Sequence, residues 1–122
     1  MISLLDRYRG CLLGLAVGDA LGAHCEGKPR EYCMSLPSIE MVGSTRHGIK
    51  PGQWTDDTSM ALCLAQSLLD CDGFDATNQM QKYANWKENG YMGCNNVCIG
   101  IGKTTACSID DWLHFGAGPL DG

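Results

Sequence analysis

The spacing of hydrophobic and polar residues along this chain predicts helices. From Leu4 to about Cys25, leucine and alanine recur without a proline, which is typical of a helix. Glycine recurs at every fourth position of this segment, at Gly10, Gly14, Gly18 and Gly22. A glycine inside a helix costs about 0.5 to 1 kcal/mol relative to alanine. We therefore expect a neighbouring helix or a ligand to lie close against this glycine stripe.

Three more helices are predicted in the second half of the chain. From Thr55 to Asp70, apolar residues recur at i, i+3, i+4 and i+7 and spread around most of the circumference, which indicates a central, buried helix. A third helix runs from about Asp75 to Asn89 and ends before Gly90. A short fourth one covers about Lys103 to Leu113.

An irregular segment separates the first two of these helices. Between Pro29 and Trp54 there are three prolines and no sustained periodicity, so we expect a loop with at most one turn of helix near Glu31 to Met34. Nothing in the sequence resembles an alternating strand, and the predicted fold class is all-α. We expect one domain over residues 1–115, followed by an irregular tail at residues 116–122.

The charge and the composition of the chain argue against two kinds of partner, nucleic acids and membranes. The net charge of -5 and the pI near 4.9 argue against nucleic acid, because phosphate binding needs clustered basic residues. The longest apolar run covers about eight residues before Asp19, whereas a bilayer-spanning helix needs about 20, so no membrane is expected. The eight cysteines include no Cys-x-x-Cys pair, and several lie in apolar helical contexts. We expect buried thiols in a reducing, intracellular and cytoplasmic setting.

The first candidate for chemistry is the start of the second long helix. Thr55 is a predicted N-cap, and Asp56 and Asp57 follow it directly in the first helical turn. One interpretation is ordinary capping, because carboxylates near a helix N-terminus are stabilised by the helix dipole. The other is a hard oxygen site for Mg²⁺ or a similar ion, which would relieve the repulsion between the two aspartates.

The second candidate is an acidic pair near the end of the first helix. Glu26 has no stabilising reason to lie at a helix C-terminus, where the dipole disfavours a carboxylate. Asp19 lies seven positions earlier on nearly the same face, with Gly22 between them. Either Asp19 pairs with a basic residue and Glu26 is simply solvated, or the two form an acidic wall that supplies an acid/base or water-positioning carboxylate.

These residues closely resemble the ADP-ribosylglycohydrolase family. The likeness lies in a Gly-Asp-x-x-Gly-x-x-x-Glu motif that ends at Glu26 and a Thr-Asp-Asp-Thr motif that begins at Thr55. Together the two motifs are specific, although either alone would be weak. Weaker likenesses follow at Tyr83 to Trp86, at Gly90-Tyr91 and at residues 102–105, so the resemblance covers about residues 5–108.

The resemblance implies the N-terminal part of an orthogonal helical bundle that removes ADP-ribose from a modified protein or small molecule. It implies two Mg²⁺ ions, with Mn²⁺ as a possible substitute, that bind ribose hydroxyls and help to activate water. By position, Thr55, Asp56 and Asp57 match metal ligands, and Glu26 matches a carboxylate with an acid/base or gating role. The further candidates for substrate binding are Asp19, Gly90, Tyr91 and Gly93.

Two departures from the family pattern bear on activity. The family's second metal block, of the type Asp-x-Asp-Asp/Thr, has no counterpart here, so we expect a truncated chain that holds half of the metal site. Gly100 stands where the family pattern has an aspartate. The alternative function is therefore a non-catalytic, crystallin-like or binding protein on the same scaffold.

Overall fold

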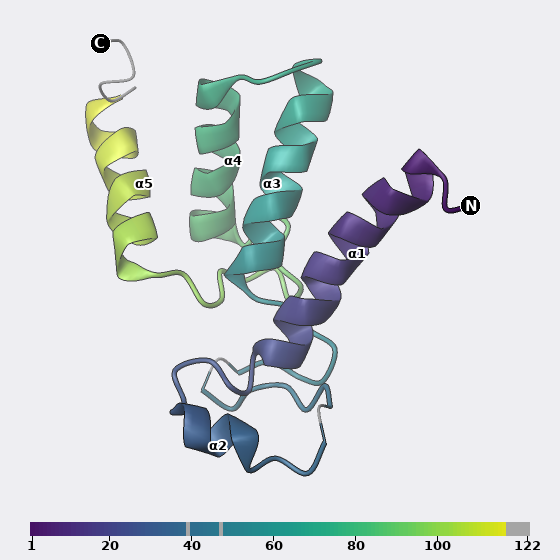
Figure 1. The fold of residues 1–122 in the computed structure, drawn as a ribbon. Helices are drawn as coiled ribbons and strands as arrows, with labels where there is room; N and C mark the ends of the chain where they lie inside the picture. The colour runs from purple at the N-terminus through teal and green to yellow at the C-terminus, as the bar shows by residue number, and fades with distance from the viewer. Residues whose placement is uncertain (39, 47, 117–122) are drawn as a thin grey trace. The chain divides into compact units, whose positions relative to one another are not determined.

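The computed structural model describes residues 1–38, 40–46 and 48–116 and places them in five helices (Figure 1). No strand occurs in these described residues, which confirms the predicted all-α class. None of the described helices is long and apolar enough to span a bilayer. The chain divides into two compact units, Met1–Thr58 and Ser59–Gly122, which are described separately below. Residues 117–122, most of the predicted tail, lie outside the described residues.

The first unit begins with the long helix α1, Leu4–Gly22. A capping box starts it, because the Ser3 hydroxyl accepts from the Asp6 N–H at 3.1 Å while the Asp6 carboxylate accepts from the Ser3 N–H at 3.2 Å. The helix ends three residues earlier than predicted, since the Cys25 N–H donates to the Gly22 carbonyl at 2.8 Å in a tighter turn. Glu26 therefore lies in a turn beyond α1, and the argument from an opposing helix dipole does not apply to it.

The glycine stripe of α1 does not have the close neighbour that we expected. A Cβ atom added at any of its four positions would have nothing within 4 Å in the part of the chain that the structure describes. The same helix also exposes large apolar side chains, namely Leu4, Leu5, Tyr8, Leu12, Leu13, Leu15 and Val17. The energetic cost of the glycines thus has no packing explanation in the described residues.

A long connection leads from α1 to the next major helix, as predicted. Among the described residues of this connection, the only helix is the short α2, Arg30–Met34, which lies beside the C-terminal end of α1 (Figure 1). Further along, Ser44 and Ile49 exchange two backbone hydrogen bonds of 3.0 Å and close a tight loop. Gly43 is required at the base of this loop, because its φ is +74° and a Cβ there would overlap the Ile49 carbonyl oxygen. Backbone contacts thus hold Ser44 and Ile49 together in this connection.

The second unit is built from helices whose bounds the periodicity predicted to within two residues. Helix α3, Asp56–Asp70, starts at the end of the first unit and continues into the second. It is followed by α4, Ala76–Asn89, and α5, Lys103–Phe115, which pack directly against each other (Figure 1). The buried core of this unit consists of Cys63, Ala84, Trp86 and Ile109.

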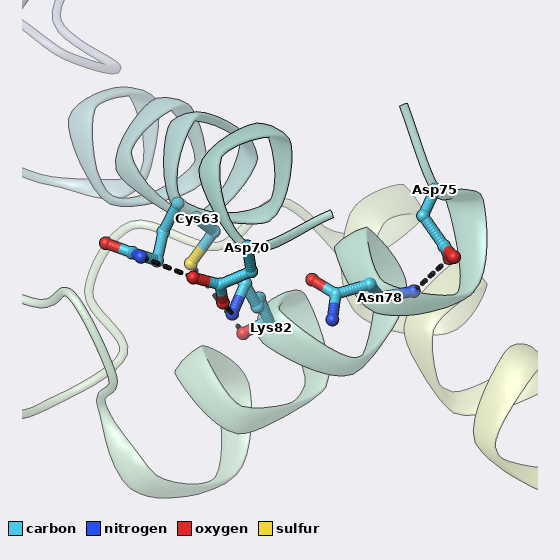
Figure 2. A network of polar contacts seen from close by, with 6 residues as sticks. Cys63, Asp70, Asp75, Asn78 and Lys82 are labelled. Atoms are coloured by element: carbon cyan, nitrogen blue, oxygen red, sulfur yellow. Dashed lines mark hydrogen bonds and ion pairs between the residues drawn. The ribbon is translucent and has the colours of Figure 1, made fainter. Parts of the chain in front are cut away.

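Polar contacts join α3 to α4 at the edge of that core (Figure 2). The Lys82 ammonium contacts the Asp70 carboxylate at 2.6 Å, and the Cys63 thiol donates to the Lys82 carbonyl at 3.7 Å. Burial raises the pKa of the Cys63 thiol to about 11. Cys63 is therefore a core residue and not an activated nucleophile. No disulfide joins the eight cysteines, all of which the structure describes.

We predict opposite effects of alanine at two glycines. Gly90 has a left-handed conformation (φ +70°), and a Cβ there would overlap the backbone of Asn96, so Gly90→Ala should lower the free energy of unfolding by about 1 to 3 kcal/mol. Gly14 has open space and helical geometry, so Gly14→Ala should raise it by about 0.5 to 1 kcal/mol. Urea unfolding followed by far-UV circular dichroism measures both, and a destabilised Gly14→Ala variant would contradict the open stripe.

Candidate metal and substrate site

The site is organised by the Asp19 carboxylate, which lies in the last turn of α1 and accepts hydrogen bonds from two threonines. The Thr55 N–H donates to its two oxygens at 3.1 and 3.0 Å, and the Thr58 N–H donates at 3.1 Å. The two threonine hydroxyls donate at 2.6 and 2.7 Å. Both threonines are buried, and hydrogen bonds to a charged group contribute about 1.5 to 3 kcal/mol each. Asp19 therefore caps the start of α3 from a position distant in the sequence.

This arrangement changes two of the sequence interpretations. Asp19 does not pair with a basic residue, because its hydrogen bonds in the described part of the chain go to Thr55 and Thr58. Thr55 directly precedes α3, as predicted, but its hydroxyl donates to Asp19, which itself accepts from the Thr58 N–H as a helix cap would. Thr58 was missed in the sequence. Its signal was a second threonine three residues after the first, at a helix start.

A pocket of about 410 Å³ opens beside this junction, within the first unit. Glu26, Thr55 and Asp57 line it together, and Asp19 lines it as well. Gly18 and Gly22 form part of the wall, where the lack of side chains leaves room for a ligand. The Glu26 and Asp57 side chains are exposed to solvent at this pocket. The structure thus brings the predicted acid/base residue and two of the three predicted metal ligands to one cavity.

Asp56, the third predicted metal ligand, is partly buried and carries an unfavourable charge. Burial raises the pKa of its carboxyl above the usual value, and the negative charges of Asp57 and Glu26 raise it further. Hydrogen bonds from its own backbone and from Thr55 act in the opposite direction without reversing the shift. The acids at the start of α3 therefore repel one another, and a cation would relieve that repulsion.

The donor set suits a hard divalent cation in part. A threonine hydroxyl and two carboxylates at a helix start are oxygen ligands of the kind that Mg²⁺ prefers. In the residues that the structure describes, however, no three His, Cys, Asp or Glu side chains converge closely enough to hold a metal ion by themselves. Thr55, Asp56 and Asp57 could therefore supply only part of a coordination shell, with the remaining oxygens coming from water, substrate or further protein groups.

The other predicted substrate residues belong to the second unit. Gly90, Tyr91 and Gly93 lie together in the turn after α4, where the Gly93 N–H donates to the Gly90 carbonyl at 2.8 Å. Both glycines are needed by the turn itself, because a Cβ at either position would overlap the backbone that follows. The Tyr91 ring lies 5.8 Å from the Lys82 ammonium, a cation–π contact. A role of these three residues in substrate binding stays a prediction.

Comparison with known proteins identifies the family of the chain. The profile of the family described as ADP-ribosylglycohydrolase matches residues 1–120, and the chain therefore belongs to that family. The match extends further towards the C-terminus than the motif likeness, which covered about residues 5–108.

Several relatives have names that describe an activity. The ADP-ribosylarginine hydrolases Tri1 of Serratia proteamaculans and of Pseudomonas putida are 42% and 40% identical to this chain, each over 93% of it. The ADP-ribosyl-[dinitrogen reductase] glycohydrolase of Rhodospirillum rubrum is 38% identical over 79% of the chain. The matched region spans only 30% of the first two proteins and 33% of the third.

Asp19→Asn tests the capping contact. The amide keeps the shape of the side chain, but its nitrogen cannot accept a hydrogen bond, so donors of Thr55 and Thr58 lose their acceptor. We expect the free energy of unfolding to fall by about 1.5 to 3 kcal/mol, as for the loss of a hydrogen bond to a charged group. Asp111→Asn, at an exposed position of α5, is the matched control and should change stability by less than about 0.5 kcal/mol. Equal stability of the two variants would show that the contact does not stabilise the fold.

Asp56→Asn tests whether the Asp56 charge destabilises the fold, through the pH dependence of the free energy of unfolding. The pKa of Asp56 is higher in the folded state than in the unfolded chain, where it is about 4. Its contribution to stability is therefore present when the pH is below the unfolded-state pKa, and it is lost as the pH rises through the folded-state pKa. The metal-free variant should therefore be more stable than the wild type at pH 7, and the difference should shrink as the pH falls below about 4. Urea unfolding in EDTA over this pH range measures it. A variant less stable than the wild type at pH 7 would contradict the prediction.

Proposed function

We propose that this chain contributes a metal and substrate half-site to a magnesium-dependent ADP-ribosylglycohydrolase. The observation that carries the proposal is the single pocket lined by Glu26, Thr55 and Asp57, next to the partly buried Asp56. Family membership supports the reaction class, which is the hydrolytic removal of ADP-ribose. The chain spans about 30% of the length of its two Tri1 relatives, so the activity belongs to this proposal and not to the description of the chain.

Three residues would hold the metal. The Asp56 and Asp57 carboxylates and the Thr55 hydroxyl oxygen face one helix start, and each offers a lone pair to a hard cation. The hydrogen bond from the Thr55 hydroxyl to Asp19, at 2.6 Å, fixes the position of that hydroxyl at the start of α3. When bound, Mg²⁺ supplies a positive charge that orients the ribose hydroxyls and stabilises negative charge during hydrolysis.

Glu26 would act as the general acid or base of the reaction. Hydrolysis joins the oxygen of water to the anomeric carbon of the ribose and breaks the bond from that carbon to the modified side chain. One proton must leave the water, and one must reach the departing nitrogen or oxygen. Glu26 is exposed at the same pocket as Thr55 and Asp57, so its carboxyl group can exchange a proton with the attacking water or the departing atom at a ribose held there.

The names of the relatives indicate which substrate to test first. Two of them are ADP-ribosylarginine hydrolases, and the Rhodospirillum rubrum protein is named for ADP-ribosylated dinitrogen reductase. We therefore propose an ADP-ribosylated protein or small molecule as substrate and take the arginine linkage as the first choice. Mn²⁺ is an alternative ion, since it also binds oxygen ligands in octahedral sites.

Calorimetric titration of the chain with ADP-ribose tests the half-site directly. Binding should require Mg²⁺, disappear in EDTA and weaken at least tenfold in Asp57→Asn, because that variant replaces a charged metal ligand by a neutral one. Asp111→Asn removes the same charge from an exposed position of α5 and should bind like the wild type. Release of ADP-ribose from an ADP-ribosylated arginine peptide, with Mg²⁺ and with EDTA, tests turnover in parallel.

Three outcomes are distinct. Metal-dependent binding with turnover supports a catalytic site. Metal-dependent binding without turnover supports the half-site and restricts this chain to binding. ADP-ribose binding that is unaffected by EDTA and by Asp57→Asn would overturn the proposal and favour the non-catalytic scaffold.

A further inference from the structure

A second pocket, of about 240 Å³, lies within the first unit and shares Glu26 with the pocket described above. Its walls carry the basic groups of Lys28 and Arg46 and the imidazole of His24. The hydroxyls of Ser44 and Thr45 line it as well. In a chain of net charge -5 with nine Lys and Arg residues, this is a local concentration of positive charge. We refer to it as the cationic pocket.

The two cations are held in place without neutralisation by a carboxylate in the described residues. The Lys28 ammonium lies 5.6 Å from the centroid of the Tyr32 ring. The Arg46 guanidinium donates to the Glu26 backbone carbonyl at 3.5 Å and covers Gly27, where a Cβ would overlap it. A ring face and a carbonyl orient a cation but leave its charge available to an anion.

His24 lines the cationic pocket and contains a buried polar atom. Its Nδ1 atom is buried and has no hydrogen-bond partner, and it is the only such atom found in the described residues of the first unit. A buried polar atom without a partner costs about 1 to 3 kcal/mol, and each such case needs an explanation. Because this atom is closed to solvent, the groups that can reach an anion in the pocket are the cations of Lys28 and Arg46.

We propose that the cationic pocket binds an acidic side chain of the modified polypeptide, near the ADP-ribosylated residue. The inference rests on the proposed function and extends it to substrate selection. If the ribose occupies the first pocket and Glu26 handles the proton of the leaving group, the polypeptide must pass next to Glu26. Glu26 also lines the cationic pocket, so side chains adjacent to the modified residue come within its reach. A guanidinium with neighbouring hydroxyls matches the fork of a carboxylate.

Two peptides that differ only at the residues flanking a central arginine, with aspartate in one and asparagine in the other, test this. Titrated without ADP-ribosylation and followed by amide chemical shifts, the aspartate peptide should bind more tightly. Arg46→Gln and Lys28→Gln should each weaken its binding by about two- to fivefold, and added salt should do the same. Arg9→Gln removes an equal charge from α1 outside the pocket and should have no effect. Arg46→Lys should restore part of the binding, since the charge returns without the fork.

Two measurements make the result specific. Magnesium-dependent ADP-ribose binding should be unchanged in Lys28→Gln, and thermal unfolding identifies any variant that has lost its fold. Equal binding of the two peptides, or wild-type binding of the aspartate peptide by both variants, overturns the inference. If the preference for aspartate persists while ADP-ribose does not bind, the ligand class of the cationic pocket is supported and the proposed function fails.

Discussion

The structure of the site depends on one interaction, the contact of the Asp19 carboxylate with Thr55 and Thr58. It joins the last turn of α1 to the first turn of α3 and satisfies two backbone N–H groups that have no partner within the helix. The same carboxylate fixes both threonine hydroxyls. Because Thr55 precedes Asp56 and Asp57 directly, this contact also sets the positions from which the two acids extend. The pocket wall is thus a consequence of a helix cap supplied across the unit.

That cap also explains why the neighbouring acids lack the stability that the helix dipole usually provides. The helix start already receives a full negative charge from Asp19, which accepts hydrogen bonds there. Asp56 adds a second charge in a partly buried place, where Asp57 and Glu26 raise its pKa further. Ordinary capping would use one acid and leave the others solvated. An accumulation of negative charge at one helix start is unfavourable for the chain alone and favourable once a cation is present.

The sequence predicted local features well and long-range ones poorly. The bounds of α3, α4 and α5 follow from periodicity and neighbouring glycines, which are properties of the residues in those segments. The partner of Asp19 could not be predicted in the same way, because Thr55 lies 36 residues away and a carboxylate has many possible donors. The grouping of Glu26 with Thr55 and Asp57 was suggested by physical chemistry but made specific by the family resemblance.

The end of α1 and the role of its glycines are two further features that the local sequence pattern did not predict. Leucine and alanine continue the helical pattern up to Cys25, whereas a turn closed by the Gly22 carbonyl ends the helix earlier. The stripe was expected to have a close neighbour because glycine is costly in a helix, yet Gly18 and Gly22 line an open pocket. At these two positions the absence of a side chain creates volume for a ligand, a property that periodicity does not encode.

Glu26 shows how backbone geometry and charge combine in this unit. It does not sit on a helix, so its position is set by the turn that follows α1, where Gly27 takes a φ of +69° that other residues rarely adopt. The Arg46 guanidinium occupies the space above Gly27 and holds the Glu26 carbonyl. The carboxylate therefore lies between an acidic pocket and a cationic one. One side chain thus belongs to the walls of both pockets, and the turn at Gly27 fixes the backbone from which it extends.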